Sequence, residues 1–360
     1  MKTRLPFRYH FLYWPVSATA LFRCIMPLLL ASNAYAQDPI FSQFTLNQLF
    51  YNPAFTGYAE QTRFFTSYRN QWPGIGMAYN SYLASVDVYL GRCNPQASKR
   101  PSFGIGVMAY HDNRGAALSA TTFQVSGAGH AYLHEKLRLS LGLQLGIISE
   151  RFDPSNLTFV AQYQTGINDP LAQSDMSWLE PDLSGGILVE YGADNDDASL
   201  FGIGMSMKHL RGKSALGDRY VQSFHVQTYY KIPIQPRFSL KGVGSEWNQY
   251  YALQPAFQFT KQGPLTQWEA GFNLIHSPFW VGLWCRGILA PTRRDALIVN
   301  LGGQFEGFLI QYSHDMTLFS SLLGYTRGAH EISLRILLEH FICINGGERR
   351  ADRRRLRCKY

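Results

Sequence analysis

The chain has 360 residues, of which 14% are aromatic, 32 are glycine and only 16% are charged. This composition favours strands and tight turns over helices, and the length fits one long all-β barrel as well as two ordinary domains. The formal net charge of +8 would suggest nucleic acid as a partner, but the basic residues are concentrated at the two ends and the body between them is near neutral, so we expect no nucleic acid.

Residues 1–36 have the pattern of a secretory signal peptide: a basic region, the apolar run 24–31 and the cleavage motif Ala34-Tyr35-Ala36. We expect cleavage after Ala36. Beyond it no run of 18 or more apolar residues remains for a transmembrane helix, so membrane association would require a barrel or a surface contact. We therefore predict a signal peptide over 1–36, an N-terminal periplasmic or lumen segment over 37–61, a barrel over 62–341 and a basic periplasmic tail over 342–360.

The N-terminal segment QDPIFSQFTLNQLFYNPAFTG (37–57) is too polar for a core helix and too apolar for a linker. Four of its apolar side chains could share one side of a short helix, namely Phe41, Phe44, Leu49 and Phe50. Pro53 would end that helix, and Asn52-Pro53-Ala54 would turn the chain into the first strand. We predict that this segment either partly closes the lumen of a barrel or docks a partner.

The central part of the chain alternates apolar and polar residues with a period of two. From Leu137 to Ile147 every odd position is aliphatic, while Arg138, Ser140 and Gln144 occupy even positions. The same alternation recurs from residues 103, 201, 224, 268 and 332 onward. A period of two predicts strands with one apolar and one polar face.

Two architectures could use such faces. In a soluble β-sandwich the polar face would be charged, and the apolar faces of two sheets would pack together. Here the polar face consists mainly of Gly, Ser, Gln and Asn with isolated charges such as Glu190 and Glu331. Aromatic residues lie near predicted strand ends, among them Tyr110, Tyr229, Trp280 and Trp284. Polar-in, apolar-out strands with aromatic girdles are typical of outer-membrane barrels, so we predict an all-β transmembrane barrel.

We predict about 14 antiparallel strands for this barrel. They lie at 62–72, 77–91, 102–111, 119–134, 137–150, 182–192, 199–209, 220–232, 237–259, 266–275, 279–289, 296–305, 308–317 and 329–339. With the first strand starting in the periplasm, the short connections 134–136, 276–278 and 306–307 fall on the periplasmic side and the long loops 151–181 and 318–328 fall outside.

No catalytic motif is present: the sequence has no G-x-S-x-G, H-E-x-x-H, P-loop or dinucleotide-binding pattern. We therefore expect neither an enzyme nor a cofactor. His209, His225, His314 and His330 show no metal-ligand spacing, and we expect lumen or turn histidines and no metal site.

Two further segments are candidate contact sites. Tyr68-Arg69-Asn70-Gln71-Trp72-Pro73-Gly74 ends the first predicted strand with hydrogen-bonding and stacking groups, which suits either an interfacial and lumen network or a docking surface. The tail 349–359 contains Arg353, Arg354 and Arg355, and it is either a solvated end or a contact for an acidic partner. A disulfide between Cys343 and Cys358 is possible in an exported protein, and the alternative is unpaired thiols. The candidate partner or plug contacts are Phe41, Phe44, Asn52, Pro53, Arg69, Asn70, Trp72, Arg353, Arg354 and Arg355.

The residues that carry a family resemblance run through most of the chain. The leader 37–57 followed by RFFTSYRNQWPGIG (63–76) resembles the start of PorP/SprF proteins of the type IX secretion and gliding systems of Bacteroidetes. IQYSHDMTLFSS (310–321) and GAHEISLRI (328–336) resemble the last two strands of that family. WVGLWCRG (280–287) stands where the family has W-x-G-x-x-Y-R, with Cys285 in place of Tyr. The insertion 244–249 is a second departure.

The resemblance implies an integral outer-membrane barrel, similar in build to fatty-acid transporter-like barrels, that supports export or surface anchoring of proteins as a scaffold. It also implies partners: outer-membrane lipids, a periplasmic lipoprotein ring with a peptidoglycan-binding protein, and secreted adhesins with a sorting domain. The alternatives are an outer-membrane channel for small hydrophobic or polar solutes and a purely structural barrel.

Overall fold

The computed structural model describes residues 37–59, 61–76, 79–91, 101–157, 175–192, 199–211, 221–234, 251–288, 294–305, 307–318 and 323–338. The predicted signal peptide, the tail with Arg353, Arg354 and Arg355, and both cysteines of the possible disulfide lie outside these residues. Cys285 is the only cysteine among them, and it is unpaired.

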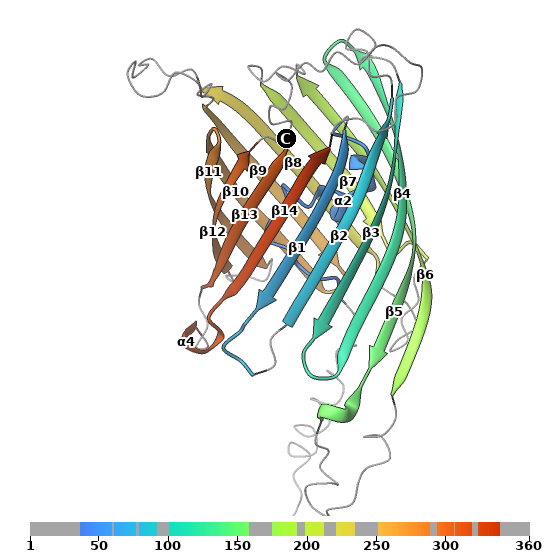
Figure 1. Ribbon diagram of the computed structural model, residues 1–360, viewed down its shortest axis with the longest axis vertical. Helices are drawn as coiled ribbons and strands as arrows, with labels where there is room; N and C mark the ends of the chain where they lie inside the picture. Colours follow the sequence, from blue (N-terminus) through green and yellow to red (C-terminus); the bar gives the residue numbers. More distant parts are fainter. Residues whose placement is uncertain are drawn as a thin grey trace, which may run out of the picture. The chain divides into compact units, whose positions relative to one another are not determined.

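The described chain forms a closed antiparallel barrel in which every strand pairs with its sequence neighbours and β1 pairs with β14 (Figure 1). The strands are β1 (Thr62–Gln71), β2 (Tyr79–Leu90), β3 (Ser102–Arg114), β4 (Leu118–His134), β5 (Leu137–Phe152), β6 (Met176–Gly192), β7 (Leu200–Lys208), β8 (Ser223–Ile234), β9 (Tyr251–Gln262), β10 (Leu265–His276), β11 (Phe279–Ile288), β12 (Arg294–Phe305), β13 (Phe308–Thr317) and β14 (Ala329–Leu338). Closure runs from the pair Thr62 and Leu338 to the pair Gln71 and Ala329. The predicted all-β barrel of about 14 strands is confirmed.

The period of two divides the wall into an apolar outer face and a polar inner face. On β5 the outward Leu143 is 66% exposed, whereas its neighbour Gln144 is 1% exposed. This arrangement leaves the apolar side chains for lipid and turns the amides and hydroxyls toward the lumen. Among the described residues, no helix has the length and apolarity needed to cross a membrane.

The structure corrects three details of the sequence analysis. Tyr110, Tyr229, Trp280 and Trp284 are buried and pack inside the barrel, because their positions have the inward parity of their strands. His314 and His330 face outward, with ring centroids 4.6 Å apart.

The third correction concerns β6, which begins at Met176, whereas the sequence pattern predicts a loop over 151–181. The segment resembled a loop because of Pro181, but Pro181 pairs only with Ile147 of β5, and the described pairing with β7 begins at Gly185. Pro is tolerated where one side of a strand needs no ladder hydrogen bond.

Residues 37–59, here called the plug, lie inside the barrel; they contain α2 (Gln48–Tyr51) and the 3-10 helix η1 (Pro53–Phe55). The predicted helix is thus shortened to a single turn that ends at Tyr51, just before Asn52-Pro53 as expected, and Pro53 then opens η1. Asn52 causes the break, because its backbone is extended and its side chain accepts a hydrogen bond from the N–H of Ala54.

The plug traverses the lumen from one mouth of the barrel to the other. Asp38 bonds Lys208, the last residue of β7, at the mouth where β1 ends with Gln71. The Gly57 N–H bonds Asp87 near the end of β2, at the mouth where β1 begins with Thr62. These ends are called the Gln71 mouth and the Thr62 mouth. Gln37 therefore lies at the mouth opposite the start of β1.

The lipid-facing assignment predicts a position-dependent cost for outward charges. Leu143→Arg places a cation near the middle of the apolar band and should destabilise the folded barrel by about 2–4 kcal/mol. Leu133→Arg, at a side chain that is 63% exposed next to the β4–β5 turn, should cost about 0–1 kcal/mol. Urea unfolding in phospholipid vesicles measures both, and equal costs would contradict the assignment.

Candidate functional site

The candidate site is the contact between the plug and the lumen wall, where many charged side chains are buried. The first contact is formed by Asp38, whose carboxylate lies 2.8 Å from Lys208 Nζ and 3.0 Å from His209 Nε2. His209 Nδ1 lies 3.1 Å from Asp182 of β6. Burial raises the pKa of Asp38, but the cationic His209 and Lys208 outweigh it, so the pKa of Asp38 is well below its usual range.

The second contact is centred on Ser42. Its N–H donates to Glu331 Oε2 at 2.7 Å and its hydroxyl donates to Asp315 Oδ2 at 2.6 Å. Arg69 and Arg286 donate to the Ser42 hydroxyl at 2.6 and 2.7 Å. Because both guanidinium groups also contact Asp315, at 2.9 and 2.8 Å, the plug completes an ion network that spans β1, β11, β13 and β14.

The third contact is made by a plug amide. Asn52 Nδ2 donates to the carbonyl oxygens of Ile187 and Met205 at 3.0 and 3.4 Å. A Cβ added to Gly186 would lie 2.0 Å from Asn52 Oδ1, and one added to Gly142 would lie 2.3 Å from the Pro53 carbonyl carbon. Glycine at these wall positions lets the plug backbone reach the strands.

The fourth contact lies near the Thr62 mouth. Arg63 Nε donates to Asp87 Oδ1 at 2.8 Å, and Asp87 Oδ2 accepts from the Gly57 N–H at 2.7 Å. Tyr58 donates to Glu190, which also accepts from Tyr229 and lies 2.6 Å from Arg138. The plug is thus held at one end by a buried ion pair and at the other by hydrogen bonds to wall carboxylates that are themselves paired with arginines.

Aromatic packing fills the space between these polar contacts. Phe44 meets Trp284 edge to face at a centroid distance of 5.3 Å, and Phe50 meets Phe41 and Tyr110 at 5.1 and 5.3 Å. Such pairs are worth about 0.5–1.5 kcal/mol beyond the area they bury. The inward aromatic residues therefore pack against the plug inside the lumen.

The structure separates the predicted contact residues into two groups. Phe41, Phe44, Asn52 and Pro53 are buried plug residues, and Arg69 reaches them from the wall. Asn70 and Trp72 do not join this contact: Asn70 Nδ2 donates to Tyr68 Oη at 3.3 Å, and the Trp72 ring packs on Tyr79 at 5.6 Å.

Sequence analysis missed several residues of the site, namely Asp38, Ser42, Lys208, Arg286 and Asp315. The signal for the wall residues was present, because each is a charge at an inward position of a strand whose neighbouring inward positions are neutral. Within the described part of the chain, no group of three or more His, Cys, Asp or Glu side chains could hold a metal ion.

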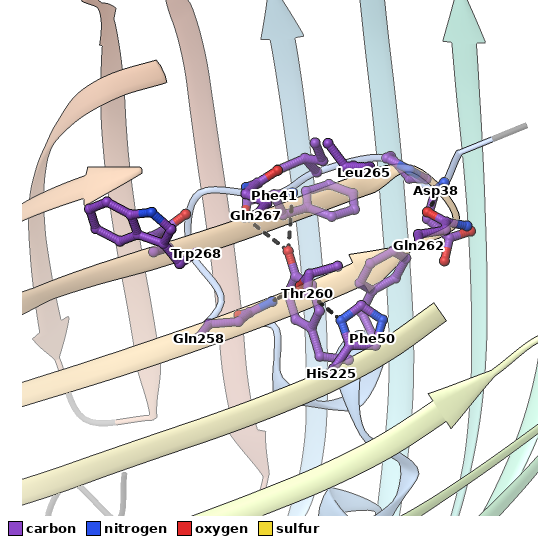
Figure 2. Close-up of a pocket in the computed structure, with 14 residues that line it drawn as sticks. Asp38, Phe41, Phe50, His225, Gln258, Thr260, Gln262, Leu265, Gln267 and Trp268 are labelled. Atoms are coloured by element: carbon purple, nitrogen blue, oxygen red, sulfur yellow. Dashed lines mark hydrogen bonds between the residues drawn. The ribbon is translucent and has the colours of Figure 1, made fainter. Parts of the chain in front are cut away.

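One pocket lies between the plug and β8–β10, lined by Asp38, Phe41, Phe50 and a row of polar wall residues (Figure 2). Its free volume is about 20 Å³, which holds a single water-sized group. A solute larger than that does not fit in this pocket.

The first prediction for the site concerns the close approach of backbone to backbone. A Cβ added to Gly104 would lie 2.2 Å from the Thr56 carbonyl oxygen and 2.6 Å from Gly57 Cα, so Gly104→Ala should displace the plug. Hydrogen exchange of residues 48–59 should accelerate at least about tenfold, which corresponds to about 1.4 kcal/mol. The control is Gly127→Ala, whose Cβ would have no neighbour closer than 3.8 Å; equal exchange in both variants would contradict the close packing.

The second prediction concerns the charge contact at the Gln71 mouth. Asp38→Asn leaves Lys208 buried without its anion and should cost about 3–5 kcal/mol. Because the folded-state pKa of Asp38 is lowered, this contribution is present at neutral pH and is lost as the pH falls below the unfolded carboxyl value of about 3.9. Urea unfolding at neutral pH measures the cost. The control Asp153→Asn, at a side chain that is 40% exposed, should change stability by less than about 0.5 kcal/mol.

Comparison with solved structures finds bacterial barrels at low identity. BamA from Haemophilus ducreyi lacking POTRA domains 1–3 is 13% identical, with 76% of this chain and 69% of that chain covered and a TM-score of 0.39. CdiB from Acinetobacter baumannii is 8% identical, with 77% and 60% covered and a TM-score of 0.41. LpxR from Salmonella typhimurium is 9% identical, with 77% and 100% covered and a TM-score of 0.36. With TM-scores this low, these likenesses carry no argument about function.

Comparison with protein families gives a specific result. No curated protein sequence matches the chain, but the family model described as "Type IX secretion system membrane protein PorP/SprF" matches residues 33–336. A membrane protein built as a closed barrel with an apolar outer face resides in the outer membrane. Since the match covers most of the chain and all 14 strands begin within it, the chain belongs to the PorP/SprF family of type IX secretion system membrane proteins.

Proposed function

We propose that this barrel is a non-enzymatic scaffold that supports type IX export or surface anchoring of secreted proteins such as adhesins. The observation that carries the proposal is the plugged lumen in a member of a secretion-system family. The apolar band fixes the barrel in the membrane. The surfaces at the two mouths are then left for partners, which we propose to be the lipoprotein ring, the peptidoglycan-binding protein and the secreted adhesin.

The plug argues against a steady solute channel. A channel for hydrophobic or polar solutes needs a free path, but the plug is bonded to the wall from Asp38 to Tyr58. Opening the path by moving the plug would separate Asp38 from Lys208, a pair whose side chains are 7% and 0% exposed. Breaking a buried pair by removing one partner costs about 3–5 kcal/mol, so a freely open state would be rare.

The scaffold proposal predicts a secretion phenotype. Deletion of the gene should abolish surface display or release of the adhesins, and the wild-type gene should restore it. Protein purified gently from outer membranes should carry the proposed periplasmic partners. An outer-membrane immunoblot confirms that each complementing variant is inserted.

The solute-channel alternative predicts intact secretion in the deletion strain and steady conductance of the purified wild-type barrel. If the plug closes the lumen, the wild-type barrel in planar bilayers should instead show no steady conductance. Gly104→Ala should then show openings and Gly127→Ala should not. Steady, selective conductance of the wild type together with intact secretion in the deletion strain would refute the scaffold proposal.

A further inference from the structure

The ion network around Ser42 contains more buried negative charge than positive charge. Arg69 lies 2.9 Å from Asp315 and 3.3 Å from Glu331, and Arg286 lies 2.8 Å from Asp315 and 3.0 Å from Glu269. Among the described residues, two guanidinium groups thus face three carboxylates. Because an uncompensated buried charge is costly, one further positive charge is required when all three carboxylates are ionised.

Three buried atoms of this network have no hydrogen-bond partner among the described residues, namely Arg69 Nε, Asp315 Oδ1 and Glu269 Oε1, and of these three residues Glu269 is the one that lines a pocket. Glu269 is 3% exposed, and Arg286 contacts only its Oε2, both from Nε and from Nη2 at 3.0 Å. Glu269 Oε1 has no hydrogen-bond partner among the described residues, and Glu269 lines the pocket of Figure 2. A carboxylate of the network with surplus negative charge, Glu269, therefore lines this pocket.

A second oxygen without a partner lies directly opposite. Gln258 of β9 is the register partner of Glu269 of β10, and both side chains point inward, so their Cβ atoms are about 4.5–5.5 Å apart. Gln258 is 6% exposed, its Nε2 donates to Thr260 Oγ1 at 3.3 Å, and its Oε1 has no partner among the described residues. Figure 2 shows Gln258 beside Thr260 on the pocket wall.

The other residues that line the pocket limit the size and the charge of the ligand that it can hold. Phe41 and Phe50 form the plug side, and aromatic faces attract cations. The nearest other charges are already paired, Asp38 with Lys208 and His209, while His225 is bonded through both ring nitrogens to Ser223 and Thr260. The space of about 20 Å³ admits one small ion.

We propose that this pocket binds one monovalent cation of the alkali or ammonium type, held between Glu269 Oε1 and Gln258 Oε1. One free carboxylate oxygen and one amide oxygen suit a single positive charge, whereas divalent ions recruit more carboxylate and water ligands. The bound cation neutralises the surplus negative charge of the network that holds Ser42. Retention of the plug in the lumen therefore depends on which cations are present at the Gln71 mouth.

The experiment uses the full-length mature barrel in detergent. Its melting temperature is measured in equal concentrations of KCl, NH4Cl and choline chloride at about pH 8, where unperturbed carboxylates are ionised. We expect higher melting temperatures in KCl or NH4Cl than in choline chloride, because binding to the folded state stabilises it by mass action. The comparison of KCl with NH4Cl distinguishes an alkali ion from ammonium. Crystals soaked in RbCl should show an anomalous peak between Glu269 and Gln258.

Three variants separate this site from general salt effects. Glu269→Gln removes the surplus charge and should abolish both the rubidium peak and the difference between KCl and choline chloride. Gln258→Leu keeps the charge but removes one ligand, so it should weaken the ion dependence even if Glu269→Gln folds poorly. Asp153→Asn, at a side chain that is 40% exposed and lies outside this network, should keep the wild-type ion dependence.

Two outcomes would overturn the proposal. Equal melting temperatures in all three salts, with no rubidium peak, would mean that a proton neutralises the surplus charge. An ion dependence that persists in both Glu269→Gln and Gln258→Leu would mean that the ions act elsewhere on the barrel.

Discussion

The structure depends on one constraint: a charge that faces the lumen must find a partner, because removal from water without one costs several kcal/mol. The wall alone does not satisfy this constraint. Asp315 and Glu331 bond Arg69, but the same carboxylates also accept the Ser42 hydroxyl and N–H. Asp87 likewise needs the Gly57 N–H as well as Arg63. The plug is thus a structural part of the inner wall as well as an obstruction.

The plug meets this constraint because it is covalently joined to β1. A segment tethered to the barrel has a high effective concentration at its own lumen, so many modest contacts suffice to hold it. The tether also fixes direction, since the chain must leave the plug at the Thr62 mouth to begin β1. Asp38 is therefore directed to the opposite mouth, where Lys208 and His209 receive it. The small wall residues Gly104, Gly142 and Gly186 provide the room along this route.

Much of the barrel could be predicted from the sequence, because alternation fixes both the strands and the face each residue occupies. The Leu137–Ile147 pattern corresponds to the outward face of β5, and the strand number follows from repeated alternation. The errors have local causes. Pro181 made the start of β6 resemble a loop. Aromatic residues near strand ends suggested girdles, although the alternation of inward and outward positions places Trp280 and Trp284 inside. Whether the plug entered the lumen could not be derived, since that depends on wall residues from β1, β7, β11, β13 and β14 meeting at one level, which no local pattern encodes.

The division of each strand into inward and outward positions also limits which surfaces such a barrel can use in secretion. Inward positions are occupied mainly by glutamine, serine and charged residues, and the wall carboxylates that hold the plug, such as Asp87 and Glu190, are also paired with wall arginines. Outward positions are apolar and are used for lipid. Under the scaffold proposal, protein partners would contact the rims of the two mouths. Because the plug links the two mouths through one continuous chain of bonded groups from Asp38 to Tyr58, a partner that displaced it at the Gln71 mouth would also loosen the contacts of Ser42, Asn52 and Gly57.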